Sequence, residues 1–198
     1  MIPYSRQYLF PKDINEVVKV LKSNYLTQGP QVTKFEKKIS KKCRSKFAVV
    51  VNSATSALHL ACLALGLKKN DILWTVPITF VASANCGRYC GAKIDLVDIN
   101  KDTFNIDVND LEKKLQIAKK QNKLPKILVP VHLGGNPCDL EKISFLAKKY
   151  KFKVIEDASH AFGSRYKKSF IGDCKYSDAV VFSFHPVKPT TSGEGGAV

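Results

Sequence analysis

Residues 180–196 read Val-Val-Phe-Ser-Phe-His-Pro-Val-Lys-Pro-Thr-Thr-Ser-Gly-Glu-Gly-Gly, the end of an apolar strand followed by a Gly-rich turn. Lys188 lies between Pro186 and Pro189, and each proline fixes its own φ and restricts the residue before it. A lysine held rigidly after an apolar strand suits Schiff-base formation with a carbonyl. In so lysine-rich a chain, a solvated loop lysine is the simpler interpretation of Lys188 alone.

Upstream of this stretch, short apolar runs alternate with segments of helical periodicity. Strands are predicted at 47–51, 72–75, 93–97, 127–131, 152–155 and 179–184. Helices are predicted at 11–24, 32–43, 52–65, 80–89, 107–120 and 137–150. Several strands are apolar throughout, which is typical of a parallel sheet covered on both faces. The predicted fold class is therefore α/β, with a mainly parallel sheet. Neither a G-x-G-x-x-G after a strand nor a Walker A motif is present, so nicotinamide and P-loop nucleotide sites have no support.

The composition is that of a soluble globular protein, with 198 residues, 44% hydrophobic and 25% charged. No apolar run approaches the ~18 residues of a transmembrane helix. The N-terminus lacks the features of a signal peptide, so we expect a cytoplasmic location. The six cysteines form no C-x-x-C pair, and we expect free, buried thiols rather than a metal site.

The net charge of +15 comes almost entirely from lysine. The lysines fall on predicted helix faces and are not interleaved with aromatic residues, as a single-strand nucleic-acid binder would require. A solvated surface that helps to steer phosphate-bearing substrates is the favoured interpretation, with neither nucleic acid nor membrane as a partner. The alternative, a basic nucleic-acid binder, predicts strongly salt-dependent DNA binding.

Polar groups follow three of the predicted strands, where ligands bind in open α/β sheets. Ser53-Ala54-Thr55 opens a helix, so it is either an anion site or an ordinary N-cap. Asp157 ends an apolar strand, and a buried carboxylate needs a partner. That partner is either a protonated ring nitrogen or the amides of the next turn. Ser183, at the end of the last strand, could donate to a phosphate.

Two further side chains have both a structural and a functional interpretation. Phe80 follows Pro77 and is either a core residue or a cover for a flat ring. His160 alone is more simply a hydrogen-bonded structural histidine. A phosphate cradle, an acidic partner for a ring nitrogen and a Schiff-base lysine are together what pyridoxal 5′-phosphate (PLP) chemistry requires.

The order and spacing of these motifs resemble the DegT/DnrJ-type sugar aminotransferases, fold-type I PLP enzymes with an aspartate aminotransferase-like large domain that act on nucleotide-linked keto sugars. The resemblance spans nearly the whole chain. The matching stretches are 26–30 (Leu-Thr-Gln-Gly-Pro), 52–58 (Asn-Ser-Ala-Thr-Ser-Ala-Leu), 75–82, 129–135 (Val-Pro-Val-His-Leu-Gly-Gly), 156–161 (Glu-Asp-Ala-Ser-His-Ala) and 182–196.

This resemblance implies catalytic roles for three residues. Lys188 would bind PLP covalently and move the proton between substrate and cofactor carbons. Asp157 would pair with the pyridine nitrogen, and His160 would lie near the ring hydroxyl. Further cofactor contacts are implied at Ala54, Thr55 and Ser183, which would hold the phosphate, and at Phe80, which would stack on the ring. Contacts to the sugar nucleotide are implied at Tyr4 and Gln28.

The resemblance also implies the reaction. Glutamate would donate its amino group through PLP to a nucleotide-linked 4-keto-6-deoxy sugar, in a homodimeric enzyme of glycan precursor biosynthesis. The residues of the motifs at 52–57 and 183–189 most resemble those of transaminases that make 4-amino-4,6-dideoxy sugars on UDP, as in the pseudaminic acid pathway. A PLP-dependent sugar dehydratase is the rival within the family. Those relatives commonly carry histidine at the lysine position, so Lys188 argues against it.

Two features depart from the family pattern. Relatives continue well beyond Val198, so we expect residues 1–198 to be the N-terminal part and most of the large PLP-binding domain, without the small C-terminal domain. The chain would then be a truncated form, and an inactive fragment is an alternative. Trp74 occupies a strand position where relatives usually have small or β-branched residues.

Overall fold

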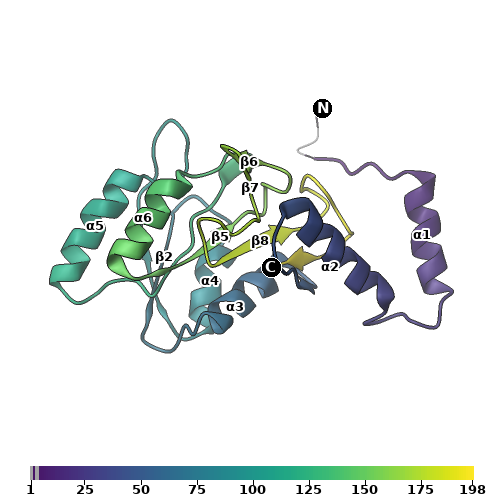
Figure 1. Ribbon diagram of the computed structural model, residues 1–198, viewed down its shortest axis with the longest axis horizontal. Helices are drawn as coiled ribbons and strands as arrows, with labels where there is room; N and C mark the ends of the chain where they lie inside the picture. The colour runs from purple at the N-terminus through teal and green to yellow at the C-terminus, as the bar shows by residue number, and fades with distance from the viewer. Residues whose placement is uncertain (1, 3–4) are drawn as a thin grey trace.

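A seven-stranded sheet with helices on both faces forms the body of the computed structural model, which describes residues 2 and 5–198 (Figure 1). The sheet order is β1-β9-β8-β5-β4-β2-β3. Neighbouring strands are parallel except at β9, which runs antiparallel to β1 and β8. The predicted α/β class with a mainly parallel sheet is confirmed. The strands are β1 (Val50–Val51), β2 (Ile72–Thr75), β3 (Lys93–Leu96), β4 (Ile127–Leu128), β5 (Lys153–Asp157), β8 (Ala179–Ser183) and β9 (Gly196–Ala197), and a separate hairpin is made of β6 (Arg165–Tyr166) and β7 (Ser169–Phe170).

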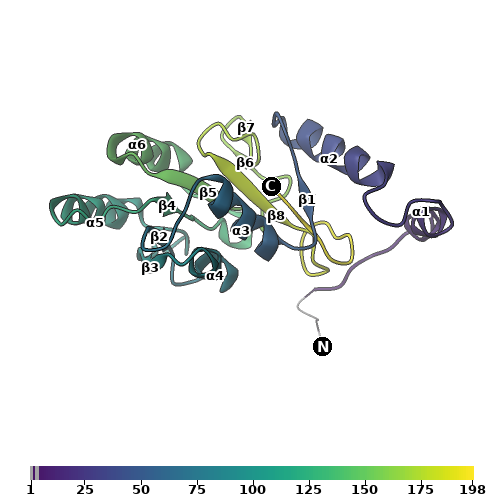
Figure 2. The same ribbon diagram turned by 90° about the horizontal axis from the view of Figure 1, so that it is seen from below.

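Helices α3 and α4 cover one face of the sheet, and α2, α5 and α6 cover the other (Figure 2). Both α3 and α4 begin shortly after a strand, so their N-termini lie at the carboxyl edge of the sheet. The helices are α1 (Pro11–Leu21), α2 (Pro30–Cys43), α3 (Ala54–Ala64), α4 (Ala82–Tyr89), α5 (Val108–Lys120) and α6 (Leu140–Tyr150), with a 3₁₀ turn η1 (Leu133–Gly135).

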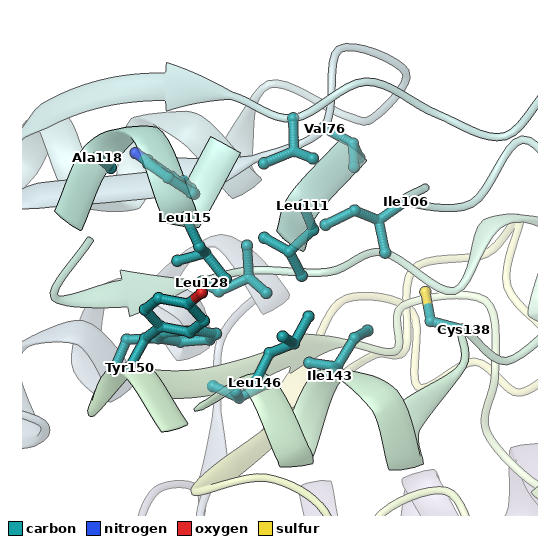
Figure 3. Close-up of a cluster of buried hydrophobic side chains, with 14 of the residues drawn as sticks. Val76, Ile106, Leu111, Leu115, Ala118, Leu128, Cys138, Ile143, Leu146 and Tyr150 are labelled. Carbon is teal, nitrogen blue, oxygen red and sulfur yellow. The ribbon is translucent and has the colours of Figure 1, made fainter. Parts of the chain in front are cut away.

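The strands supply side chains alternately to the two faces. In β4, Ile127 packs beneath α3 and α4, whereas Leu128 packs beneath α5 and α6. Figure 3 shows the hydrophobic cluster between the sheet and helices α5 and α6, in which Leu111 and Leu115 of α5 pack against Ile143 and Leu146 of α6. The periodicity predicted these inward-facing positions, and all four side chains are buried.

Trp74, for which the sequence offered no account, lies in the same cluster and is 1% exposed. The Nζ atom of Lys114 lies 4.9 Å from the centre of its ring. The same Nζ forms an ion pair with Asp95 at 2.7 Å. A cation–π contact therefore joins the α5 surface to the sheet through the tryptophan.

Several short elements differ from the prediction. β1 is limited to the two residues that face β9, and β4 ends before Pro130, which has no N–H for the ladder. The two-residue strands β6, β7 and β9 carry too little pattern to be predicted. None of the cysteines forms a disulfide, but Cys90 is half-buried and Cys174 is exposed, so the prediction of burial is wrong for these two.

Helix α1 buries none of its side chains and stands apart from the sheet (Figure 2). Its apolar stripe is 39–64% exposed at Ile14, Val17, Val18 and Leu21. This helix therefore contributes nothing to the core of the body.

Within the residues that the structure describes, every helix is too short or too polar to span a lipid bilayer.

Candidate active site

One pocket of about 300 Å³ lies at the carboxyl edge of the sheet, beyond the ends of β1, β2, β5 and β8. Seven of the nine predicted site residues line it, although they come from four separate stretches of the chain. These seven are Ala54, Thr55, Phe80, Asp157, His160, Ser183 and Lys188. The topology therefore brings together the groups that the sequence placed at strand ends.

The first side of the pocket is the N-terminus of α3. Ser53 caps the helix, because its Oγ accepts a hydrogen bond from the amide of Ser56 at 3.2 Å. In the described part of the chain, the amides of Ala54 and Thr55 have no acceptor. They face the pocket with the positive end of the helix dipole, which is the arrangement that binds phosphate.

Strand β9 packs directly behind this helix start. A Cβ atom built on Gly196 would collide with the backbone of Ser53 and Ala54. The position therefore excludes any side chain, and this requirement fixes the distance between β9 and the anion site. On the neighbouring strand, Ser183 is 7% exposed, and its Oγ accepts the amide of His185 at 3.4 Å. The hydroxyl hydrogen of Ser183 remains free for a ligand.

Asp157 lines the pocket and is 4% exposed. Its Oδ1 accepts hydrogen bonds from the amide of Ser159 at 3.1 Å and from its hydroxyl at 2.6 Å. Its Oδ2 accepts the hydroxyl of Ser83 at 2.6 Å. The sequence analysis missed both serines, because neither lies in a sequence pattern that distinguishes it from an ordinary helix or turn serine. In the described residues Asp157 has no cationic partner in contact, so a cation in the pocket would find an oriented acceptor.

Lys188 lies in the loop between β8 and β9 and is half-buried. Its amide donates to the carbonyl of His185 at 2.9 Å, which closes the Pro-Val-Lys turn. Burial lowers the pKa of the Lys188 ammonium, and the negative charge of Asp157 opposes part of that shift. The neutral, nucleophilic amine is therefore easier to reach than on a surface lysine.

His160 presents a defined tautomer. Its Nδ1 accepts the amide of Gly134 at 3.2 Å, so in the neutral ring the proton is on Nε2. Burial lowers the pKa of His160, and the positive charge of Lys188 adds to this, while Asp157 acts in the opposite direction. The neutral ring is thus favoured, with Nε2–H as a hydrogen-bond donor for the pocket.

A buried pair supports the loop that carries Gly134. His132 donates from Nε2 to Glu156 at 2.8 Å, and its Nδ1 accepts the amide of Cys138 at 3.1 Å. Both side chains are nearly inaccessible, at 0% and 3%. The pair ties β5 to the loop after β4, and it does not line the pocket.

Phe80 lines the entrance, and its side chain is 72% exposed, so it is not a core residue. At the same entrance His185 and Glu194 lie 3.8 Å apart, and the sequence analysis singled out neither. Gln28 is exposed in the turn before α2 and does not line the pocket, while Tyr4 lies outside the described residues. The predicted sugar contacts at Gln28 and Tyr4 therefore remain predictions. In residues 2 and 5–198, no three His, Cys, Asp or Glu side chains converge as a metal site requires.

Comparison with known sequences gives a consistent set of relatives. The model of the DegT/DnrJ/EryC1/StrS aminotransferase family matches residues 8–198. The chain is 47% identical over 198 residues to the UDP-4-amino-4,6-dideoxy-N-acetyl-beta-L-altrosamine transaminase of Campylobacter jejuni (strain 81-176), covering 100% of this chain and 51% of the relative. It is 38% identical to the GDP-perosamine synthase of Escherichia coli O157:H7, covering 100% and 52%. The chain thus spans about half the length of the curated relatives it matches.

Solved structures agree. Helicobacter pylori PseC, an aminotransferase involved in the biosynthesis of pseudoaminic acid, superposes with a TM-score of 0.89 at 36% identity, over 98% of this chain and 51% of PseC. The PLP form of the putative sugar aminotransferase Spr1654 from Streptococcus pneumoniae gives a TM-score of 0.89 at 31% identity, over 99% and 52%. The fold around the pocket is therefore that of sugar aminotransferases.

Proposed function

Because the chain belongs to the DegT/DnrJ/EryC1/StrS aminotransferase family, we propose that it binds PLP in the pocket at the carboxyl edge of the sheet. We propose further that it serves the transfer of an amino group from glutamate to a nucleotide-linked 4-keto-6-deoxy sugar. The family resemblance predicted from the motifs is confirmed. The observation that carries the proposal is the convergence of Lys188, Asp157 and the α3 N-terminus on one pocket.

The residues present fit this cofactor. The oxygens of a phosphate would accept hydrogen bonds from the free amides of Ala54 and Thr55 and from the hydroxyl of Ser183. Asp157 offers an acceptor for a protonated ring nitrogen, and the Nε2–H of His160 offers a donor for the ring hydroxyl. The exposed ring of Phe80 is available to cover a flat ligand at the entrance.

When bound, PLP supplies an electrophilic carbonyl and an electron-accepting ring. The chain supplies the rest. Lys188 would hold the cofactor covalently through its ε-amino nitrogen, and the same nitrogen, when not bonded to the cofactor, would carry the proton that moves during the reaction. The lowered pKa of Lys188 favours the neutral state that proton uptake requires.

Trapping with borohydride tests the assignment. The chain is incubated with PLP, reduced, digested and mapped by mass spectrometry, with Lys188→Ala and the exposed-lysine control Lys151→Ala in parallel. We expect a phosphopyridoxyl group on Lys188 in the wild type and in Lys151→Ala, and none in Lys188→Ala. A label confined to another lysine would refute the role of Lys188.

The substrate class is tested separately. UDP-linked 4-keto-6-deoxy sugars are supplied with glutamate, and formation of the 4-amino sugar is followed by mass spectrometry. The similarity to the C. jejuni transaminase supports UDP as the nucleotide. A wild-type chain that traps PLP on Lys188 but aminates only other keto acceptors would leave the cofactor assignment intact and overturn the sugar.

We also propose that residues 1–198 form most of the large cofactor-binding domain and that the protein acts as a homodimer. The support for a partner is the exposed apolar surface beside the pocket, where Ile78 and Val81 are 41% and 57% exposed, and the unburied stripe of α1. Sedimentation equilibrium measures the mass in solution, and a monomer at micromolar concentration in the presence of PLP would contradict the dimer.

A further inference from the structure

The Asp157 carboxylate has three of its acceptor positions occupied from within the chain. A carboxylate offers about four lone-pair sites on two oxygens. Ser159 fills two sites on Oδ1 through its amide and hydroxyl. Ser83 fills one site on Oδ2 at 2.6 Å. By this count, a single acceptor site remains, and it belongs to Oδ2, the oxygen that Ser83 holds.

Ser83 is itself oriented by a second hydroxyl. Its Oγ lies 2.7 Å from the Oγ1 of Thr79. Ser83 has one hydroxyl hydrogen, which it donates to Asp157, so Thr79 must be the donor in the second bond. The 2.7 Å approach to Ser83 is shorter than the 3.3 Å from the Thr79 hydroxyl to the carbonyl of Phe80, which is the competing acceptor. The two hydroxyls thus form a chain directed toward the carboxylate, and each bond strengthens the next.

The position of Ser83 separates it from the cofactor site. Its side chain is 0% exposed, and it does not line the pocket, whereas Thr79 and Asp157 do. A helical serine commonly returns its hydrogen to a carbonyl of its own helix. Ser83 instead donates to the carboxylate of a residue 74 positions away in the chain. Its hydroxyl is therefore committed to the orientation of Asp157.

We propose that Ser83 is a positioning residue for the cofactor ring: by holding Oδ2 of Asp157, it keeps the last free acceptor site of the carboxylate directed at the protonated ring nitrogen. This inference rests on the proposed PLP site. The inference predicts a selective effect. If Ser83 acts only through the ring nitrogen, its removal weakens binding of PLP and leaves unchanged the binding of an analogue whose ring has no nitrogen.

The test compares dissociation constants for PLP and for its analogue in which the ring nitrogen is replaced by C–H. Binding is measured by equilibrium dialysis, without reference to activity. We expect Ser83→Ala to weaken PLP binding by about tenfold, as the loss of a hydrogen bond to a charged group does. Its affinity for the carbon analogue should stay at the wild-type value. Ser144→Ala, which removes another buried helical serine away from the pocket, should change neither.

Two further variants keep the test decisive. Thr79→Val removes the hydroxyl that orients Ser83, and it also changes the lining of the pocket. Its effect is therefore measured as the ratio of the two dissociation constants, in which changes common to both ligands cancel. We expect this ratio to change in the same direction as in Ser83→Ala, and by less. In an Asp157→Ala background, Ser83→Ala should leave the ratio unchanged.

An unchanged ratio of the two dissociation constants in Ser83→Ala would overturn the inference, whether both affinities stay at their wild-type values or fall equally. If the wild type binds PLP no better than the carbon analogue, or binds neither, the proposed site itself fails, and the inference fails with it. A wild type that prefers PLP, beside a Ser83→Ala variant with the same preference, overturns the inference alone.

Discussion

Two sides of the pocket hold their functional groups in opposite ways. On the carboxylate wall (Asp157 and Ser159, with Ser83 buried behind them), the carboxylate is 4% exposed and accepts three hydrogen bonds. On the lysine loop (residues 184–195), Lys188 is half-buried, and in the described residues its ε-amino group has no hydrogen-bond partner. One group is fixed by its surroundings, and the other is free to turn.

The contrast matches the proposed tasks. A buried carboxylate without donors would be costly, and hydrogen bonds also keep its plane constant toward a ligand. A lysine that both holds a cofactor and carries a proton must occupy more than one position, and strong partners would oppose that movement. Rigidity thus lies with the group that orients, and freedom with the group that reacts.

Removal of the free group should have the largest effect. Lys188→Ala is expected to lower turnover at least about 10³-fold, within the range for loss of a proton-transfer group, since the covalent attachment is lost as well. PLP should still bind non-covalently, because the carboxylate wall and the α3 N-terminus remain. Initial rates and dialysis measure the two effects. A loss of all PLP binding would show that the two sides are not independent.

Neutralising the fixed group should have the next largest effect. Asp157→Asn presents an amide to Ser83 and Ser159 and no charge to the ring. We expect PLP affinity to fall about 10- to 100-fold, the range for hydrogen bonds to a charged group. Binding of the carbon-ring analogue should change little. If both ligands weaken equally, Asp157 acts on the pocket's shape rather than on the ring nitrogen.

A change where the lysine loop joins the sheet should act on the stability of the fold, because Gly196 packs against the start of α3. In Gly196→Ala the new Cβ meets the backbone of Ser53 and Ala54, which is expected to cost about 1–3 kcal/mol of unfolding free energy. Urea unfolding measures it. Gly193→Ala is the control, because no atom lies within 4 Å of its Cβ and only its φ of +85° is unfavourable. Gly193→Ala measures the cost of a positive φ without a close contact, and a loss below about 1 kcal/mol in Gly196→Ala would contradict the close approach.

The smallest effect concerns the charge of His160, which both sides influence. Its pKa is lowered in the folded state, so between that value and the unfolded value of about 6.5 the unfolded chain binds more protons. Stability from this source is present above pH 6.5 and declines as the pH falls through that value. The advantage in thermal stability that the wild type draws from the neutral His160 ring should therefore shrink relative to His160→Gln as the pH falls from 7.5 to 5.5, since other titrating groups contribute equally to both proteins. In Lys188→Ala the dependence should shrink, since one cause of the shift is gone, and an unchanged slope in both variants would contradict the assignment.

The larger elements of this fold could be predicted, because periodicity marks them. β2 and α5 fall where the sequence places them, to within one residue. The pocket could be predicted only in part. Asp157 and Lys188 follow apolar strands and stand out, whereas Ser83 looks like any helical serine until the sheet brings it to residue 157. β9 is a strand only because β1 and β8 supply partners on both sides.

The position of β9 between β1 and β8 also bears on how this pocket forms. Val50 pairs with Ala197, so in the described residues the segment that leads into α3 joins the sheet through β9, which lies far away in the chain. Pairings of such high contact order close slowly, because a long loop must lose its entropy before any hydrogen bond compensates. We therefore expect the β2–β5 region to fold first and the anion-binding helix start to become ordered last, with ligand phosphate stabilising the ordered state once it has formed.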